Sequence, residues 1–529
     1  MAEMRTRRAT ITAAVVSATA VLLAACDTDP DVTVRAPATR EITTTTDAER
    51  VTPAGGGEQA PVADDGGADA LQPSIGYSIE WQPLTGDVDA GTITVPLDYR
   101  DPDGDTIDLR VAIHRADEDE RIGVLFANNG GPGAAASTIA MNAPGWFAPD
   151  LVDRFDIVSW DPRGTGRSVP ADCIDDDEYD DFFATGDITP ETEQEHDGLV
   201  EQAEEFAGRC IERVGSILPH LGTNNTARDM DAIRQALDVP QASYFGFSYG
   251  SELGGVWATL FPTTVRAAVF DGAVDPNADS VETTRLQYVG FEGALDTFLS
   301  ECSDDDGCAF HNDGDAAAAF DELYDAVDRS PLDSSGERTP VNQGVMQTAV
   351  VQAMYSDLFW PRLAEALADA QDGDGNGLLA LHDDYFQRSP DGSYSDLIES
   401  FQAISCADDP DRPTIGEADA EAERLDGAAP RLFPDPQGDY ACTFFPASAE
   451  PRAEVTGVGA GPIVVIGTTG DAATPLVSSE RMADALEDGR LVVVEANQHT
   501  GYGVNGCVLD VVHEYLIQLV PPDDGTVCD

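Results

Sequence analysis

The chain of 529 residues contains no lysine. Its 29 basic residues are all arginines, and they face 98 aspartates and glutamates, so the formal net charge is −69. Binding to nucleic acid is excluded, because too few basic groups are present to neutralise phosphates. Charge of one sign at this density repels itself unless salt screens it, and at about 1 M salt the Debye length is only about 3 Å. We therefore expect adaptation to high salt.

Apolar runs long enough to cross a membrane are also missing. The run from Ile11 to Leu23 is too short and too rich in small residues for a span, and arginines precede it, which is typical of a secretion signal. It ends in Leu23-Ala24-Ala25-Cys26, which resembles a bacterial lipobox, whose cysteine is acylated. We predict a lipoprotein signal peptide over 1–26 with lipid on Cys26. The alternative is an ordinary signal with an incidental cysteine.

Large apolar residues are scarce in the next stretch, from Asp27 to about Gln72, which is rich in Thr, Asp, Pro, Ala and Gly. Such a segment cannot bury enough apolar surface to fold, so 27–74 is predicted to be a disordered tether. A lipid on Cys26 would hold the rest of the chain at the outer face of the membrane. We expect an extracytoplasmic protein of the cell envelope, either lipid-anchored or secreted, whose only membrane contact is the lipid.

The cysteines lack the CxxC spacing of a zinc or redox site. Without Cys26 eight remain, an even number in a chain predicted to be exported, which favours disulfides over metal binding or catalysis. Sequence alone cannot choose rigorously among the many pairings. Proximity favours Cys302–Cys308, and the further expected pairs are Cys173–Cys210, Cys406–Cys442 and Cys507–Cys528.

Gly246-Phe247-Ser248-Tyr249-Gly250 has the G-x-S-x-G form of a nucleophile elbow, a strained strand-to-helix turn that exposes a serine. Glycine is needed on both sides because the turn leaves no room for side chains. Ala242 to Phe245 reads as a buried strand before the elbow, and apolar residues recur at helical spacing after it. We predict that Ser248 is a nucleophile. The alternative is a tight Gly-Ser turn without catalytic function.

A second glycine-rich turn, from Asn128 to Gly133, follows the predicted strand Gly123 to Ala127. The backbone N–H of Gly130 or Gly131 is predicted to be one donor of an oxyanion hole, whereas Pro132 has no N–H. The second donor is predicted to be the backbone amide of Tyr249, the residue after the nucleophile.

The nucleophile needs a base, and the base needs an acid that orients it. Of the seven histidines, only His499 follows a late buried strand in a loop that contains glycines. Asp471 follows an apolar strand that begins at Pro462, and the order Ser248, Asp471, His499 is the one expected of α/β-hydrolases. Asp271, at the end of the strand after the nucleophile helix, is the alternative acid.

The combined motifs resemble secreted actinobacterial tripeptidyl aminopeptidases and their proline-iminopeptidase-like relatives, from about Trp81 to the C-terminus. The resemblance implies an α/β-hydrolase fold with a mostly parallel central sheet, an inserted helical cap, and the triad Ser248, Asp471 and His499. The sequence departs from the family at Gln498 and at Glu252. The matching stretches are Asn129 to Gly133, Asp161 to Ser168, Thr226 to Leu237, Gly246 to Gly255, Phe261-Pro262, Asp471-x-x-Thr474-Pro475, and His499 with Cys507.

The catalytic core is expected to consist of 75–272 and 455–529, with the cap insertion at 273–454. A cap narrows the site and would exclude folded proteins, which suits an exopeptidase. An exopeptidase must also hold the α-ammonium of its substrate. Ala403 to Asp408 resembles a recurrent family segment, so Asp408 is the candidate for that role. The alternative is that Asp408 is one acid among many on a solvated surface.

Three local patterns complete the expectations. The turn from Asp161 to Gly166 is expected to have a structural role, and Thr226-x-x-Asp229 is predicted to be the capping box of the helix before the elbow strand. Asp372 to Asp383 nearly fits an EF-hand calcium loop but lacks the bidentate glutamate. We expect an acidic helix-turn-helix there and neither a metal nor another cofactor. Calcium is the alternative.

The sequence thus predicts an exported serine exopeptidase that releases short peptides, tripeptides in particular, from free N-termini through an acyl-enzyme. Its partners would be peptides with a free N-terminus. One alternative is a carboxylesterase or lipase on the same triad, and another is a non-catalytic peptide-binding lipoprotein. The sequence leaves the oligomeric state open.

Overall fold

The computed structural model describes residues 76–529 except 187, 191, 336 and 337. The predicted signal peptide, the lipid on Cys26 and the predicted tether lie outside the described residues. Among the helices that are described, all are too short or too polar to span a bilayer.

In the described part of the chain, ten strands form one sheet in the order β1-β2-β3-β5-β4-β6-β7-β8-β9-β10. The strands β1, β2 and β3 pair antiparallel, and β3 is also antiparallel to β5. From β5 to β10 all neighbours are parallel, as predicted for an α/β-hydrolase. The strands are Gln82–Thr85 (β1), Val88–Pro96 (β2), Thr106–His114 (β3), Gly123–Asn128 (β4), Phe155–Trp160 (β5), Ala242–Phe247 (β6), Val265–Asp271 (β7), Ile463–Thr468 (β8), Gly489–Val494 (β9) and Thr526–Cys528 (β10).

Helices cover both faces of this sheet because the central strands are apolar on both sides. Phe126, Tyr244 and Phe270 pack in one buried cluster with α6, α7 and α16. Leu125 and Phe245, which are adjacent in sequence to Phe126 and Tyr244 and therefore point to the opposite face of the sheet, pack in a second buried cluster with α1, α3 and α17. These helices, with the short α2, are Ser137–Met141 (α1), Ala143–Trp146 (α2), Pro149–Val152 (α3), Thr223–Ala236 (α6), Tyr249–Leu260 (α7), Leu476–Ala485 (α16) and Gly506–Gln518 (α17).

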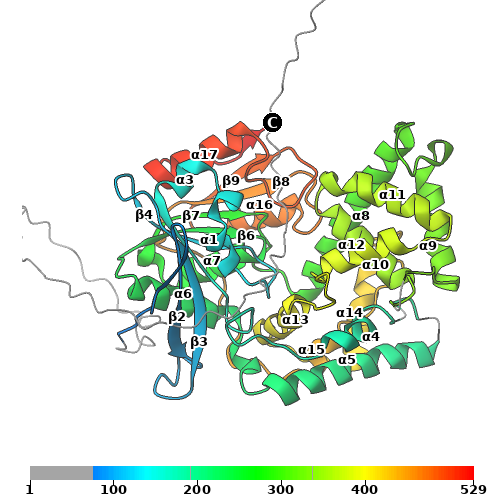
Figure 1. Cartoon of the computed structure of the whole chain (residues 1–529), viewed down its shortest axis with the longest axis horizontal. Coiled ribbons are helices and arrows are strands. Elements are labelled where there is room, and N and C mark those ends of the chain that lie inside the picture. The colour runs from blue at the N-terminus through cyan, green and yellow to red at the C-terminus, as the bar shows by residue number, and fades with distance from the viewer. Residues whose placement is uncertain (1–75, 187, 191, 336–337) are drawn as a thin grey trace, which may run out of the picture. The chain divides into compact units, whose positions relative to one another are not determined.

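The helical cap comes from two separate parts of the chain (Figure 1). Most of it lies between β7 and β8, as expected. Two more helices, α4 and α5, lie between β5 and α6, and α5 packs against α15. The second part was not foreseen, because it falls within 75–272. The cap helices are Tyr179–Phe183 (α4), Glu193–Val214 (α5), Ser280–Asp304 (α8), Ala316–Arg329 (α9), Gln343–Met354 (α10), Trp360–Gln371 (α11), Asn376–Tyr385 (α12), Leu397–Asp408 (α13), Ile415–Ala422 (α14) and Ala441–Phe444 (α15).

The four expected disulfides are all present. Cys173–Cys210 ties the loop after β5 to α5, Cys302–Cys308 closes the end of α8, Cys406–Cys442 joins α13 to α15, and Cys507–Cys528 joins α17 to β10. Disulfides of this number are typical of proteins that fold outside the cytoplasm.

The predicted capping box before the elbow strand is wrong. Thr226 and Asp229 lie inside α6 and are buried, and the helix begins at Thr223. The N–H of Thr223 instead donates to Oδ1 of Asp408 in the cap, at 2.7 Å. Asp229 accepts two hydrogen bonds from the buried Arg163, at 2.8 and 2.7 Å, which confirms the structural role expected for the turn that contains Arg163.

The acidic loop that resembles an EF-hand has other partners. Both oxygens of Asp383 accept hydrogen bonds from Arg338, at 2.8 and 2.7 Å. Oδ1 of Asp374 accepts from the backbone N–H of Asn376 at 3.0 Å. Throughout the described residues, no group of three or more His, Cys, Asp or Glu side chains could hold a metal ion.

The charge imbalance predicts that the protein becomes more stable as salt increases. If every arginine paired with an acid, 69 of the 98 acidic side chains would still lack a partner. Added salt weakens the surface ion pairs, but each of these contributes only about 0–1 kcal/mol to stability. The reduced repulsion among the excess acidic side chains should therefore have the larger effect. We expect the melting temperature to rise by roughly 10 °C or more between about 0.1 and 2 M NaCl.

Circular dichroism during heating measures this effect. Sucrose is the control, because an excluded osmolyte favours the compact state without screening charge. An equal rise in sucrose, or no rise in NaCl, would contradict the role of charge.

Candidate active site

The G-x-S-x-G stretch forms the predicted elbow. Ser248 lies between β6 and α7 with φ 55° and ψ −126°, a strained conformation for a residue with a side chain. A Cβ atom at Gly246 would lie 2.2 Å from the carbonyl oxygen of Gly250, and one at Gly250 would lie 2.9 Å from that of Asn128. The turn therefore requires glycine at both positions. Ser248 is only half-buried, so a substrate can reach it.

His499 and Asp471 lie together, as predicted. Nδ1 of His499 is 3.0 Å from each carboxylate oxygen of Asp471. The Asp471 side chain is fully buried and that of His499 is 11% exposed. Burial disfavours the charged imidazole, but the charge of Asp471 and its hydrogen bond outweigh this and raise the pKa of His499 above its usual value. Asp471 thus fixes the ring and stabilises its protonated form.

Thr474 contacts both Asp471 and His499, although the sequence analysis predicted no role for it. Its backbone N–H donates to Oδ1 of Asp471 at 2.8 Å, and its hydroxyl donates to Oδ2 at 3.0 Å. Its Oγ1 also lies 3.2 Å from Nδ1 of His499. The signal was in the sequence, because an aspartate followed three residues later by threonine before a helix is a pattern in which a side chain caps the backbone.

Asp271, the alternative acid, binds the loop after the histidine rather than its ring. Its wholly buried carboxylate accepts the N–H groups of Gly501 at 2.7 Å and Tyr502 at 2.8 Å, and burial raises its pKa to about 6. Its carbonyl oxygen accepts the N–H of Ser248 at 2.8 Å. The end of β7 therefore contacts both the elbow and the histidine loop.

The ring of His499 lies close to Gly272, the residue that follows the end of β7. A Cβ atom at Gly272 would lie 3.0 Å from Cε1 of His499. Ser248 and His499 thus both lie next to the segment Asp271-Gly272.

The glycine-rich turn after β4 lies against the nucleophile. A Cβ atom at Gly130 would lie 2.8 Å from Cβ of Ser248 and 3.2 Å from the backbone nitrogen of Tyr249. The N–H of Gly130 donates to the side chain of Asn128 at 2.9 Å, so Gly131 is the better oxyanion donor of the two. The turn and the Tyr249 amide lie together, as expected for an oxyanion hole.

The cap meets the core on both sides of this site. On one side, the backbone of α13 approaches the oxyanion turn so closely that a Cβ atom at Gly133 would lie 2.5 Å from the Leu397 carbonyl oxygen. On the other side, the N–H of His499 donates to the carbonyl of Tyr355 at 2.8 Å, and the N–H of Asp357 donates to Asn497 at 3.0 Å. The cap thus bounds the site and binds the histidine loop directly.

Asp408 is close to the site but its oxygens are occupied. They accept the N–H and the hydroxyl of Thr223, at 2.7 and 2.5 Å. The Thr223 hydroxyl oxygen lies 2.5 Å from that of Tyr249. Burial raises the pKa of Asp408 to about 7. These contacts give Asp408 a role in capping α6, and its predicted role in binding an α-ammonium stays a prediction.

The two departures from the family pattern are both at the edges of the site. Glu252 lies buried in the first turn of α7 and pairs with Arg452, so it is compensated within the protein. Gln498 forms an isolated bridge with Ser356 of the cap, and its side chain donates to the carbonyl of Thr500 at 2.9 Å.

Residues 123–505 match the family described as alpha/beta hydrolase fold, and the chain belongs to this family. It is 33% identical to serine protease Hip1 of Mycobacterium tuberculosis over 495 residues, 88% of this chain and 93% of that protein. It is 30% identical to tripeptidyl aminopeptidase of Streptomyces coelicolor over 476 residues, 85% and 86% of the two chains. It is 33% identical to carboxylesterase B of Mycobacterium tuberculosis over 447 residues, 82% and 84% of the two chains.

These relatives confirm the predicted resemblance to tripeptidyl aminopeptidases and, with the fold, identify the protein as a hydrolase. Their names include two peptidases and one esterase.

Proposed function

We propose that the protein is an exported serine exopeptidase that releases short peptides, tripeptides in particular, from free N-termini. The observation that carries the proposal is the His499–Asp471 pair beside a strained, accessible Ser248. Peptidases among the relatives support the reaction class. The cap that bounds the site on two sides supports action on chain ends rather than on folded proteins.

In this reaction Oγ of Ser248 attacks the carbonyl carbon of the scissile bond while Nε2 of His499 takes its proton. The negative oxygen of the tetrahedral intermediate accepts the N–H groups of Tyr249 and Gly131. His499 then gives the proton to the leaving amine, which departs and leaves an ester on Ser248. Water, deprotonated by His499, attacks the ester carbonyl; the bond to Oγ of Ser248 breaks, His499 returns the proton to Oγ, and the short peptide is released.

One peptide in two forms tests the proposal. The protein is incubated in high salt with the free peptide and with its N-acetylated form, and the products are identified by mass spectrometry. We expect short N-terminal fragments from the free peptide alone, and none when the Ser248→Ala variant replaces the wild type. Internal cleavage, or equal cleavage of both forms, would contradict exopeptidase action.

A second candidate is a carboxylesterase on the same triad, which the similarity to carboxylesterase B favours. An esterase needs no free amine in its substrate. If both peptides survive while p-nitrophenyl esters are hydrolysed, this candidate replaces the exopeptidase.

A further inference from the structure

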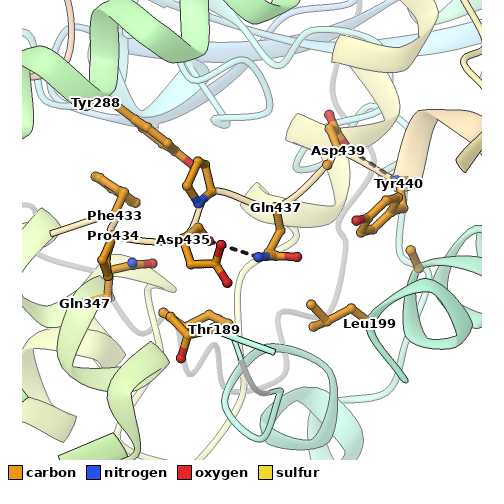
Figure 2. A pocket seen from close by; sticks show the side chains of 15 residues that line it. Thr189, Leu199, Tyr288, Gln347, Phe433, Pro434, Asp435, Gln437, Asp439 and Tyr440 are labelled. Atoms are coloured by element: carbon orange, nitrogen blue, oxygen red, sulfur yellow. Dashed lines mark hydrogen bonds between the residues drawn. The ribbon is translucent and has the colours of Figure 1, made fainter. Parts of the chain in front are cut away.

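A pocket of about 330 Å³ lies in the cap (Figure 2), and its lining includes none of the predicted triad residues. It is lined by residues of α5, α8 and α10 and by the loop from Phe433 to Ala441. These segments are far apart in the sequence, and none of the motifs discussed above includes the loop.

One wall of the pocket is aromatic. The rings of Tyr288, on α8, and Phe433 stack with centroids 4.0 Å apart and planes at 4°. Tyr288 is half-buried. The outer faces of such a stacked pair carry the negative end of the ring quadrupole, and such faces attract cations.

The pocket also contains a carboxyl group with one hydrogen bond from the protein backbone. Oδ1 of Asp439 accepts the N–H of Ala441 at 3.2 Å. Although the residue as a whole is exposed, desolvation of its carboxyl raises the pKa of Asp439 above its usual range. Burial raises the pKa of Tyr288 to about 12, and the charge of Asp439 adds to this shift; both residues line the pocket.

This pocket is connected to the candidate active site by two helices. On α8, two residues after Tyr288, a Cβ atom at Gly290 would lie 2.3 Å from the carbonyl oxygen of Ala472, the residue after Asp471. On α13, the side chain of Gln402 donates to the sulfur atoms of Cys406 and Cys442, at the end of the pocket loop. Its neighbour Phe401 packs on the oxyanion turn, since a Cβ atom at Gly133 would lie 2.7 Å from the Phe401 nitrogen. Helix α8, which lines the pocket, thus reaches the acid loop, and α13, which the Cys406–Cys442 disulfide joins to the end of the pocket loop, reaches the oxyanion turn.

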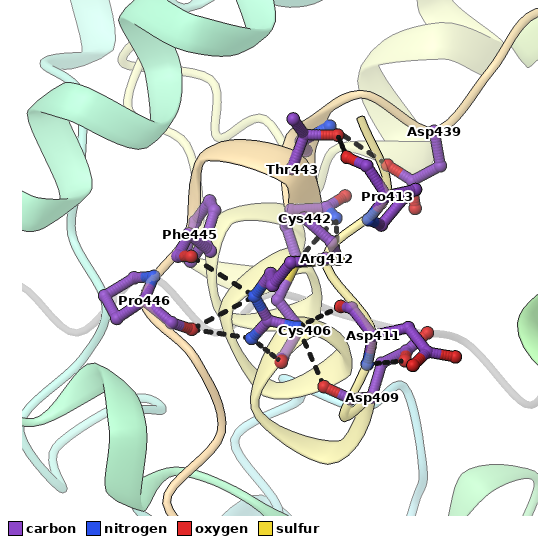
Figure 3. The surroundings of a disulfide bond; sticks show 12 residues. Cys406, Asp409, Asp411, Arg412, Pro413, Asp439, Cys442, Thr443, Phe445 and Pro446 are labelled. Carbon is purple, nitrogen blue, oxygen red and sulfur yellow. Dashed lines mark hydrogen bonds between the residues drawn. A yellow bond between two sulfur atoms is a disulfide. The ribbon is translucent and has the colours of Figure 1, made fainter. Parts of the chain in front are cut away.

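The end of the pocket loop is held in place (Figure 3). Cys442, three residues after Asp439, forms a disulfide with Cys406 of α13. The guanidinium of Arg412 donates to the carbonyl oxygens of Cys406, Phe445 and Pro446, on both sides of this disulfide. These contacts hold the segment that follows Asp439, so the end of the loop loses little conformational entropy when a ligand binds.

We propose that this pocket binds the positively charged group of the peptide substrate, an ammonium or guanidinium, against Asp439 and the Tyr288–Phe433 wall. The cation would neutralise a partly desolvated carboxylate and lie against the aromatic rings. The N-terminal ammonium and a lysine or arginine side chain share this chemistry. The inference rests on the proposed peptidase function, because it assigns the pocket to the same substrate.

Asp439→Asn is the decisive variant. Asparagine keeps an oxygen that can accept the Ala441 N–H, so the loop should keep its conformation while the charge is lost. We expect kcat/KM for cationic peptides to fall by about 10- to 100-fold, mainly through a higher KM, as for loss of a hydrogen bond to a charged group. Hydrolysis of an uncharged p-nitrophenyl ester should be unchanged. Asp426→Asn, which removes an exposed charge elsewhere in the cap, is the matched control.

Two free peptides distinguish the two sources of the cation: one with a neutral residue and one with an arginine near the N-terminus. An equal loss on both peptides supports the ammonium, and a loss confined to the arginine peptide supports the side chain. An equal loss on both peptides and on the ester, or no loss on any substrate, overturns the pocket assignment. If the wild type cleaves none of the peptides, the proposed function fails as well. Cleavage by the wild type with an unaffected Asp439→Asn variant overturns the pocket alone.

Discussion

Replacing Ser248 with alanine is expected to lower kcat by at least about 10⁴-fold, for a peptide or an ester. In the proposed reaction the hydroxyl oxygen of Ser248 forms the acyl-enzyme, and no other group in the elbow is assigned that role. In serine hydrolases, removal of the nucleophile costs about as much as removal of the whole triad, and only the contribution of the oxyanion hole and of binding remains. Rates are measured with the purified variant at a salt concentration where both proteins are folded.

The same variant tests whether the protein is a hydrolase at all or a peptide-binding lipoprotein. Alanine removes only the hydroxyl, so the fold and peptide binding should be intact, and calorimetry should give a Kd for the variant close to the wild-type KM when chemistry is slow. Ser330→Ala, at an exposed cap position, is the matched control. Unchanged turnover in Ser248→Ala would reject this serine as the nucleophile. A wild type that retains peptide without cleaving it would favour the lipoprotein alternative.

The sheet could be predicted from the sequence because its central strands are buried on both faces. Phe155–Trp160 is buried along its whole length and is apolar except for Asp156 and Ser159, and Ala242–Phe247 leads into a turn that only glycines permit. Local pattern determines such elements, since burial dictates residue type position by position. The predicted triad relies on the same strands, because Ser248, Asp471 and His499 lie in the loops where β6, β8 and β9 end.

What could not be predicted depends on contacts between distant residues. The helix α6 begins at Thr223 because Asp408, 185 residues away, accepts its N–H, and this outweighs the local capping pattern at Thr226. Helix α5 belongs with the cap because it packs against α15, over 200 positions later in the chain. The pocket joins Tyr288 with Asp439 in the same way. Local hydrophobic periodicity carries no information about contacts between residues so far apart in the sequence. These contacts arise from tertiary packing.

Replacing Asp471 with asparagine is expected to lower kcat by about 10⁴-fold while leaving the fold intact. Both oxygens of Asp471 accept hydrogen bonds, from Thr474 and from the imidazole of His499. An asparagine must direct its NH₂ group at one of these donors. If it faces His499, Nδ1 must become an acceptor, and the tautomer that leaves Nε2 free to take the serine proton is lost.

The pH profile gives a second, independent readout of the same change. Asp471 raises the pKa of His499, and the imidazole must be neutral to act as a base. In the wild type kcat/KM should therefore fall with decreasing pH along a limb that lies above the usual histidine pKa of about 6.5. Without the charge of Asp471, the imidazolium loses its main stabilisation. In the variant, the fall of kcat/KM should occur at lower pH, and the maximum of kcat/KM should be much smaller than in the wild type.

Asp271→Asn is the comparison that separates the two acids. Asp271 holds the backbone of Gly501 and Tyr502, and its more distant charge is a lesser cause of the raised pKa of His499. An asparagine there can accept only one of the two N–H groups well, so it should lower the melting temperature and shift the pH limb slightly. The loss in kcat should stay within about 100-fold, because the His499–Asp471 bond remains. A loss of about 10⁴-fold in Asp271→Asn with a mild effect in Asp471→Asn would reverse the assignment, since only the acid that orients the imidazole controls its tautomer.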